Sequence, residues 1–126
     1  MNEIYEYRVV VCVGSNSSDR ERRVDEAEDF LQELFGSDCV FSPMLDSNDT
    51  SGRTERRYTN SLCLGNYDGD YEMLNSELKR YEAVHRVRHS DGEVEIDLDI
   101  VLFDGQVKRP GTYISPYFQY LYASLK

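Results

Sequence analysis

The segment from Glu93 to Phe103 (EVEIDLDIVLF) alternates acidic and aliphatic residues with a period of two. Successive side chains of a β-strand point to opposite faces of the sheet, so the pattern predicts a strand with one apolar and one acidic face. Four aliphatic residues are expected to face a layer of helices: Ile96, Leu98, Ile100 and Leu102. Four carboxylates are expected to share the opposite, open face: Glu93, Glu95, Asp97 and Asp99.

Strand-like and helix-like segments alternate along the rest of the chain. The apolar runs 7–13, 39–41 and 58–64 favour three further strands. Ser18 and Glu21 resemble a capping box, and the helix that follows should end at Gly36. Its apolar residues recur at helical spacing: Val24, Ala27, Leu31, Leu34 and Phe35. A second helix is marked in the same way by Tyr71, Leu74, Leu78 and Tyr81.

The resulting β-α-β-β-α-β order matches the ferredoxin-like arrangement, an antiparallel sheet with two helices on one face. We expect one α+β domain over residues 1–126, since this length suits a single compact core. The other face of the sheet is free unless the tyrosine-rich tail covers it. Residues 46–57 are polar and predict a long exposed loop, and residues 106–108 predict a short return strand after Asp104-Gly105.

The net charge of −10 argues against partners that need a basic surface, such as nucleic acids and anionic membranes. No apolar run is long enough to cross a membrane and no signal peptide is recognisable, so we expect a cytoplasmic protein. We also expect either a monomer or a weak homodimer. Three cysteines, none forming a close pair, favour buried free thiols over disulfides or a zinc site: Cys12, Cys39 and Cys63.

The acidic face of the last strand has two interpretations. Acids on a strand are common on a solvated face, and edge strands use charge against aggregation. However, aspartate is a poor strand former, and all four charges have the same sign. Mg²⁺ shared by Asp97 and Asp99 would relieve their repulsion, and Mg²⁺ usually brings substrate phosphates with it.

Arg86 and Arg88 flank a single residue just upstream, so in extended backbone they point the same way. They are either cations that stabilise a helix C-terminus or guanidinium groups that clamp phosphate beside the metal. Carboxylates, a divalent metal and arginines together indicate phosphoryl or nucleotidyl transfer.

These motifs together resemble the 6-hydroxymethyl-7,8-dihydropterin pyrophosphokinase family of folate biosynthesis. The resemblance runs from Val9 to about Gly105. It is carried by five short motifs in order along the chain: Val13-Gly14-Ser15-Asn16 with Asp19-Arg20, Ser42-Pro43, Tyr58-Thr59-Asn60, Arg86-Val87-Arg88 and Ile96–Phe103.

The resemblance implies that ATP and two Mg²⁺ ions bind and that the β,γ-pyrophosphoryl group passes to the pterin's hydroxymethyl oxygen, with release of AMP. Asp97 and Asp99 would then hold both metal ions. Arg86, with Arg88 beside it, would contact the phosphates, so that Asp97, Asp99 and Arg86 are the expected catalytic residues. Asn60 would hydrogen-bond the pterin ring, with Tyr58 in the same pocket.

The chain departs from the family's pattern in two places. Residues 89–95 (HSDGEVE) stand where the family has Arg-Trp-Gly-Pro-Arg, and Ser115-Pro116-Tyr117 stands where it has Pro-His. The alternative function is therefore a catalytically weakened relative that binds a nucleotide or a protein through the same fold. Substitutes for the lost groups would be the loop arginines Arg53, Arg56 and Arg57 or His89, which are otherwise solvated surface residues.

Overall fold

The apolar run after Glu6 forms the central strand of the molecule. In the computed structural model, which describes residues 6–48, 57–85 and 94–125, β1 (Tyr7–Ser15) lies between β4 (Arg57–Tyr67) and β5 (Asp97–Phe103). It is antiparallel to both strands. Three short strands extend the sheet: β2 (Val40–Phe41), β3 (Leu45–Asn48) and β6 (Gln106–Val107). Within the described residues the strand order is β2-β4-β1-β5-β6, with β3 also paired to β4.

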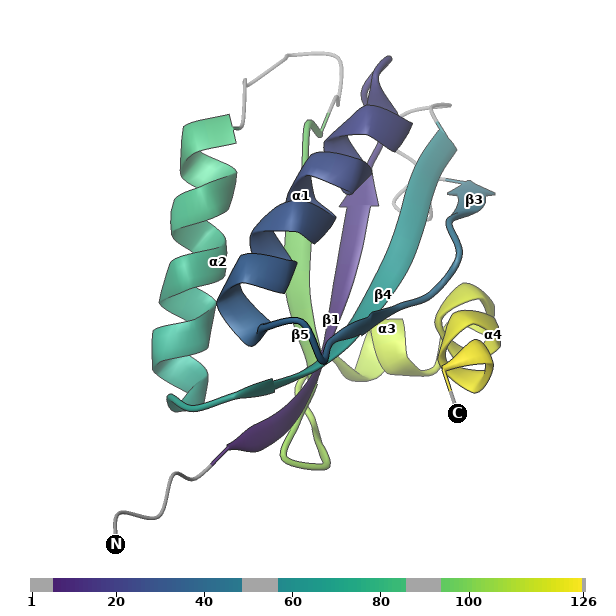
Figure 1. The fold of residues 1–126 in the computed structure, drawn as a ribbon. Coiled ribbons are helices and arrows are strands. Elements are labelled where there is room, and N and C mark those ends of the chain that lie inside the picture. The colour runs from purple at the N-terminus through teal and green to yellow at the C-terminus, as the bar shows by residue number, and fades with distance from the viewer. Residues whose placement is uncertain (1–5, 49–56, 86–93, 126) are drawn as a thin grey trace, which may run out of the picture.

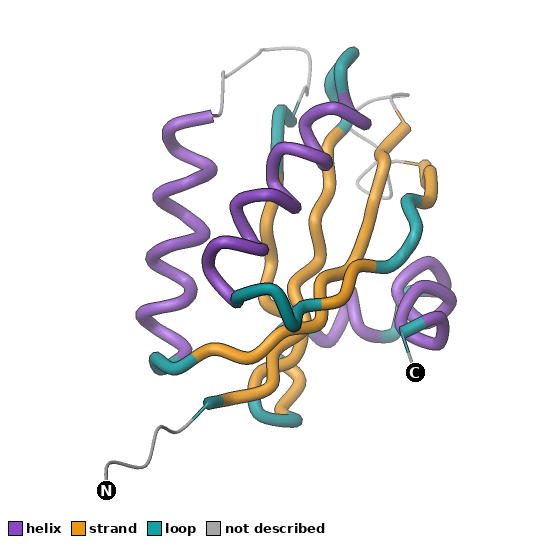
Figure 2. Tube along the Cα trace, in the orientation of Figure 1, coloured by secondary structure: helices purple, strands orange, loops and turns teal. Residues whose placement is uncertain are grey.

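Two long helices cover one face of this sheet, as Figures 1 and 2 show. These are α1 (Arg20–Phe35) and α2 (Tyr71–His85), and both bury apolar side chains against the odd-numbered valines of β1. The expected end of α1 is confirmed, because Gly36 adopts φ of +91° and its N–H donates to the carbonyl of Gln32. The predicted capping box is wrong: the cap position is Asp19, whose side chain accepts no capping hydrogen bond.

The C-terminal tail forms two short helices on the opposite face (Figure 1). These are α3 (Pro110–Tyr113) and α4 (Pro116–Ser124), each beginning at a proline that suits the first helical position. Phe118 and Leu121 of α4 are fully buried against a second apolar cluster that includes Val10, Leu62 and Val101. The tail therefore covers part of the face that the first two helices leave free.

Leu102 does not lie on the face that the alternation predicted. Val10 pairs with Leu102 and Val11 pairs with Ile100, so one residue of β5, Val101, is extra at this point. This β-bulge turns both Val101 and Leu102 towards α4, whereas Ile100 stays beneath α1 and α2. The prediction is confirmed for Ile96, Leu98 and Ile100 and is wrong for Leu102.

Glu95 is likewise not on an open acidic face. The strand begins at Asp97, and Glu95 precedes it with only 7% of its surface exposed. Its Oε2 lies 3.0 Å from Nε of Arg23 on α1, so the charge is compensated on the helical side of the sheet. Glu93 lies outside the described residues.

The loop expected over residues 46–57 is shorter than predicted, because β3 begins at Leu45 and pairs with residues 57–60 of β4. The polar composition of residues 46–48 concealed this strand. The predicted return strand is confirmed as β6. The fold class is α+β with an antiparallel sheet, as expected.

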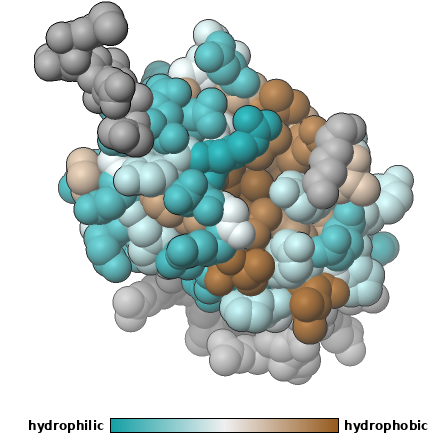
Figure 3. Space-filling view, turned by 90° about the horizontal axis from the view of Figure 1, so that it is seen from below, coloured by the Kyte–Doolittle hydropathy of each residue, from teal (hydrophilic) through white to brown (hydrophobic). Residues whose placement is uncertain are grey.

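All three cysteines are free thiols. Burial is confirmed for Cys12 and Cys63 and is wrong for Cys39, which is only partly buried. Burial raises the pKa of the Cys12 and Cys63 thiols, so neither is a ready nucleophile. Of the helices in the described ranges, none combines the length and apolar character needed to cross a membrane. Seen from the end of the sheet at which β1 begins, apolar residues form a band bordered by hydrophilic ones (Figure 3).

Candidate active site

Two rows of paired residues cross the second face of the sheet next to α4. Gly14 of β1 pairs with Asn60 on one side and with Asp97 on the other. In the next row, Cys12 pairs with Leu62 and with Asp99. Adjacent strands lie about 4.8 Å apart, so the Asn60 and Asp97 backbones are separated by roughly 10 Å across Gly14. The topology thus brings the predicted substrate and metal residues onto one face.

Gly14 is needed for the space between these residues. A methyl group at this position would lie 3.3 Å from Oδ1 of Asn60 and 3.7 Å from Cδ1 of Tyr58. Because Gly14 has no side chain, only backbone atoms of this residue lie between Asn60 and Tyr58 on one side and Asp97 on the other. This gives a physical reason for the glycine of the Gly14-Ser15-Asn16 motif.

Asp97 and Asp99 lie next to each other on this face, and Asp99 is mostly buried, with 19% of its side chain exposed. Its Oδ1 accepts a hydrogen bond of 2.6 Å from Nη2 of Arg109, and Nζ of Lys79 lies 3.6 Å from the same oxygen. Burial raises the pKa of Asp99, with a further upward contribution from the charge of Asp97, against the opposing effect of Arg109 and Lys79. The carboxylate is therefore not on a freely solvated surface.

The pair of carboxylates fits the requirements of Mg²⁺. Mg²⁺ is typically bound through one or two protein carboxylates, with waters and substrate phosphates completing its coordination. No cluster of three or more metal-binding side chains occurs in the parts of the chain that the structure describes. Asp97 and Asp99 alone would therefore make a site that depends on the phosphates of a nucleotide.

Asn60 is buried, and its amide nitrogen donates hydrogen bonds within the sheet. Nδ2 donates to the carbonyl of Leu45 at 3.2 Å and to Oγ of Ser47 at 2.7 Å, both in β3. The backbone carbonyl can only accept, so this pair of contacts fixes the amide orientation and leaves Oδ1 on the side of Gly14. Asn60 thus shares the face of Leu62 without being part of the apolar cluster beneath α4.

The turn after β1 holds the start of β5. The backbone N–H of Asn16 donates to the carbonyl of Val94 at 3.0 Å, and Oδ1 of Asn16 accepts the backbone N–H of Val94. Oγ of Ser15 also donates to the Val94 carbonyl, at 3.4 Å. Residues 15 and 16 therefore position the segment that leads directly into Asp97.

The outer edge of β5 is fixed by α2. Oε1 of the buried Glu82 accepts the backbone N–H of Leu98 at 3.3 Å, and Nζ of Lys79 donates to the Leu98 carbonyl at 3.2 Å. Lys79 and Glu82 are themselves paired at 2.8 Å. This arrangement satisfies backbone groups between the two aspartates and holds their strand in place.

Two residues near the aspartates were not identified from the sequence, namely Lys79 and Arg109. Tyr117 of the tyrosine-rich tail also lies near them. Oη of Tyr117, from the first turn of α4, lies 3.9 Å from Sγ of Cys12, beside Asp99 in the pairing. No local motif marks these residues, because only the packing of α2 and the tail brings them to β5. The sequence offers a single indication, which is that a cationic and a hydroxyl side chain, Arg109 and Tyr117, follow shortly after the β5–β6 hairpin.

Several predicted residues lie outside the described ranges, namely Arg86, Arg88, His89, Arg53 and Arg56. Arg57, the remaining loop arginine, begins β4 and is exposed. The geometry of the expected phosphate clamp is therefore not part of the site described above.

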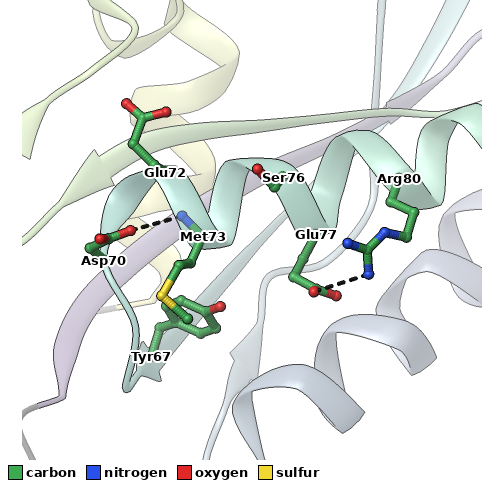
Figure 4. A pocket seen from close by; sticks show the side chains of 7 residues that line it. All are labelled: Tyr67, Asp70, Glu72, Met73, Ser76, Glu77 and Arg80. Carbon is green, nitrogen blue, oxygen red and sulfur yellow. Dashed lines mark hydrogen bonds and ion pairs between the residues drawn. The ribbon is translucent and has the colours of Figure 1, made fainter.

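A surface hollow lies elsewhere, where β4 runs into α2 (Figure 4). Seven residues line it: Tyr67, Asp70, Glu72, Met73, Ser76, Glu77 and Arg80. Two polar contacts join lining residues to one another: Asp70 accepts the backbone N–H of Met73, and Arg80 pairs with Glu77 at 3.3 Å. None of the predicted site residues lines this hollow.

Comparison with known proteins identifies the chain's relatives. The family model of 7,8-dihydro-6-hydroxymethylpterin-pyrophosphokinase matches residues 10–123, which is nearly the whole chain. No individual curated protein matches the chain. The family match spans both rows of the candidate site and the tail that lies beside them. The chain belongs to the 7,8-dihydro-6-hydroxymethylpterin-pyrophosphokinase family, a family of pyrophosphokinases in folate biosynthesis.

Proposed function

We propose that the protein transfers pyrophosphate from ATP to 6-hydroxymethyl-7,8-dihydropterin in a Mg²⁺-dependent reaction. The hydroxymethyl oxygen forms a bond to the β-phosphorus and gives up its proton, the bond from the β-phosphorus to the α-phosphate oxygen breaks, and AMP leaves. The observation that carries this proposal is the placement of Asn60 and Asp97 on either side of Gly14. The strand order β2-β4-β1-β5 also supports a ferredoxin-like arrangement.

In this proposal Asp97 and Asp99 hold the metal ions. Two Mg²⁺ ions would neutralise the triphosphate and align it for in-line attack. The carboxylates suit this role because they share one face, and because Lys79 and Glu82 fix the backbone of Leu98 between them. A strand held in this way keeps both carboxylates at a constant separation, which favours catalysis by positioning.

Asn60 and Tyr58 are proposed to bind the pterin at the other end of the Gly14 row. The Asn60 amide nitrogen is already bonded to β3, so Oδ1 is the atom that would accept a hydrogen bond from the pterin's N–H groups. A residue whose rotamer is fixed by two hydrogen bonds orients its ligand at little entropic cost. Arg86 and Arg88 remain proposed phosphate ligands on the strength of the motif alone.

The direct test is an assay of AMP release with 6-hydroxymethyl-7,8-dihydropterin, ATP and Mg²⁺. Turnover should require Mg²⁺ and should be lost in Asp97→Ala and in Asp99→Ala, with the folded structure retained because neither side chain belongs to the two apolar clusters. Glu77→Ala, on the outer face of α2, is the matched control and should be as active as the wild type. Absence of turnover in folded wild-type protein would refute the proposal.

The weakened relative is kept as a second candidate because Asp99 is already paired with Arg109 and Lys79. Calorimetry with ATP and Mg²⁺ separates the two functions. Tight nucleotide binding without turnover indicates a binding protein, whereas turnover indicates the pyrophosphokinase. A cytoplasmic location and a monomeric or weakly dimeric state are also part of the proposal.

A further inference from the structure

One oxygen of Asp99, the Oδ1 that faces the tail, is already bonded to the guanidinium group of Arg109. Nη2 of Arg109 donates to Oδ1 at 2.6 Å, a short, charge-assisted hydrogen bond. Nζ of Lys79 lies 3.6 Å from the same oxygen. Asp97, Asp99 and Glu82 contribute three negative charges and Lys79 and Arg109 two positive ones, so these five side chains together carry a charge of −1. The two cations offset much of the attraction that the carboxylates exert on a divalent cation.

The two cations are held very differently. Lys79 pairs with the buried Glu82 at 2.8 Å and donates to the Leu98 carbonyl, so it is fixed to the edge of β5. Arg109 lies between β6 and α3 with 51% of its side chain exposed, and it forms an ion pair with Asp99. Because half of the Arg109 side chain is exposed, water can solvate its guanidinium when another cation takes its place on Asp99.

We propose that Arg109 is an exchangeable counter-ion, which passes from Asp99 to the nucleotide phosphates when the metal–nucleotide complex binds. The inference rests on the proposed function and assigns a role to a residue of this chain's own tail. A metal ion that takes the tail-facing oxygen of Asp99 must displace Arg109, and the released guanidinium then has phosphate oxygens within reach. Metal and nucleotide therefore bind together more tightly than either does alone.

Calorimetry on the EDTA-treated full-length protein tests this exchange without relying on turnover. Mn²⁺ is titrated alone and in the presence of α,β-methylene-ATP, whose reacting linkage cannot be cleaved. In the wild type the nucleotide analogue should tighten Mn²⁺ binding. In Arg109→Gln, Mn²⁺ alone should bind at least about fivefold more tightly, because a positive charge a few ångströms from the divalent ion is removed, and the tightening by the analogue should be reduced.

Two further variants make the outcome specific. Arg109→Lys retains the charge and should behave like the wild type in both titrations. Arg80→Gln changes the net charge equally but lies on the outer face of α2, paired with Glu77, and should leave both affinities unchanged. Equal behaviour of Arg109→Gln and Arg80→Gln would overturn the counter-ion role while leaving the proposed function intact. A wild type that binds no Mn²⁺ even with the analogue would overturn both.

Discussion

Asn16 and Val94 are joined by two hydrogen bonds across 78 residues of sequence. One runs from the Asn16 backbone to the Val94 carbonyl, and the other runs from the Val94 backbone to the Asn16 side chain. An asparagine used in this way substitutes for a residue of a paired strand. The glycine-serine-asparagine turn therefore sets where β5 begins, and with it the position of Asp97 on the sheet.

Replacing Asn16 with alanine should lower the free energy of unfolding by about 1–2 kcal/mol, because the Val94 N–H loses its acceptor in a largely buried site. Urea denaturation measures this loss. Gln32→Ala removes an exposed amide from α1 and should change stability by less than about 0.5 kcal/mol. Equal stability of the two variants would show that the turn does not hold β5.

The ion pair between Arg23 and Glu95 should make a measurable contribution to stability. Arg23→Met removes a charge 3.0 Å from a carboxylate that is nearly buried, and should cost about 1–3 kcal/mol. The cost should be smaller in a Glu95→Gln background, since the charge to be compensated is then absent. A double-mutant cycle by urea denaturation gives the coupling between the two residues.

The exposed pair of Arg80 and Glu77 supplies the comparison for that cycle. Its side chains lie 3.3 Å apart on the outer face of α2, where solvent screens the charges. Its coupling should be below about 0.5 kcal/mol. A coupling for Arg23 and Glu95 no larger than this would contradict a structural role for Glu95.

Phe118→Ala should destabilise the protein by about 3–5 kcal/mol, the usual cost of removing a fully buried phenylalanine. Thermal and urea denaturation would show the loss in a single transition if α4 belongs to the same cooperative unit as the sheet. Tyr120→Ala, on the same helix but 69% exposed, should have little effect. Similar stability for both variants would mean that the tail is not part of the folded core.

Stability should depend on pH through Glu28. Burial on α1, with the nearby charge of Asp25, raises the pKa of Glu28 from 4.5 to about 7. Between these values the unfolded chain ionises while the folded protein keeps the proton, so stability falls as pH rises through this window. Glu28→Gln should therefore raise the urea midpoint relative to the wild type at pH 8 and leave it unchanged at pH 4.

Glu33→Gln is the matched control, because Glu33 is exposed on the same helix. It should leave the pH dependence as in the wild type. Titration of the Glu28 carboxyl carbon by NMR gives the pKa directly, and a value near 4.5 would contradict the prediction.

Local patterns predicted those parts of the fold that local forces determine. The helical spacing of Val24, Ala27 and Leu31 defined the buried side of α1, and Gly36 ended that helix as expected. The alternation around Leu98 correctly separated the apolar face from Asp97 and Asp99. These features need only the period of a helix or a strand.

The remaining features depend on contacts that a period cannot reveal. A strict period of two assumes a regular strand, so it misplaced Leu102 beyond the bulge and Glu95 before the strand begins. Arg109 reaches Asp99 only because a hairpin reverses the chain between them. The tail's aromatic residues have no clear helical period, and their burial in α4 follows from the apolar surface that the sheet offers.

The additional residue in β5 lets one seven-residue strand serve three different surroundings. Its first half presents carboxylates beside the tail, its middle contributes to the apolar cluster under α4, and Phe103 packs at an angle against the rings of Tyr7 and Tyr71 on the other face. Deleting Val101 would leave Leu102 opposite Val10 and Phe103 opposite Val9, on the faces that they occupy now, and would remove one apolar side chain from the cluster under α4.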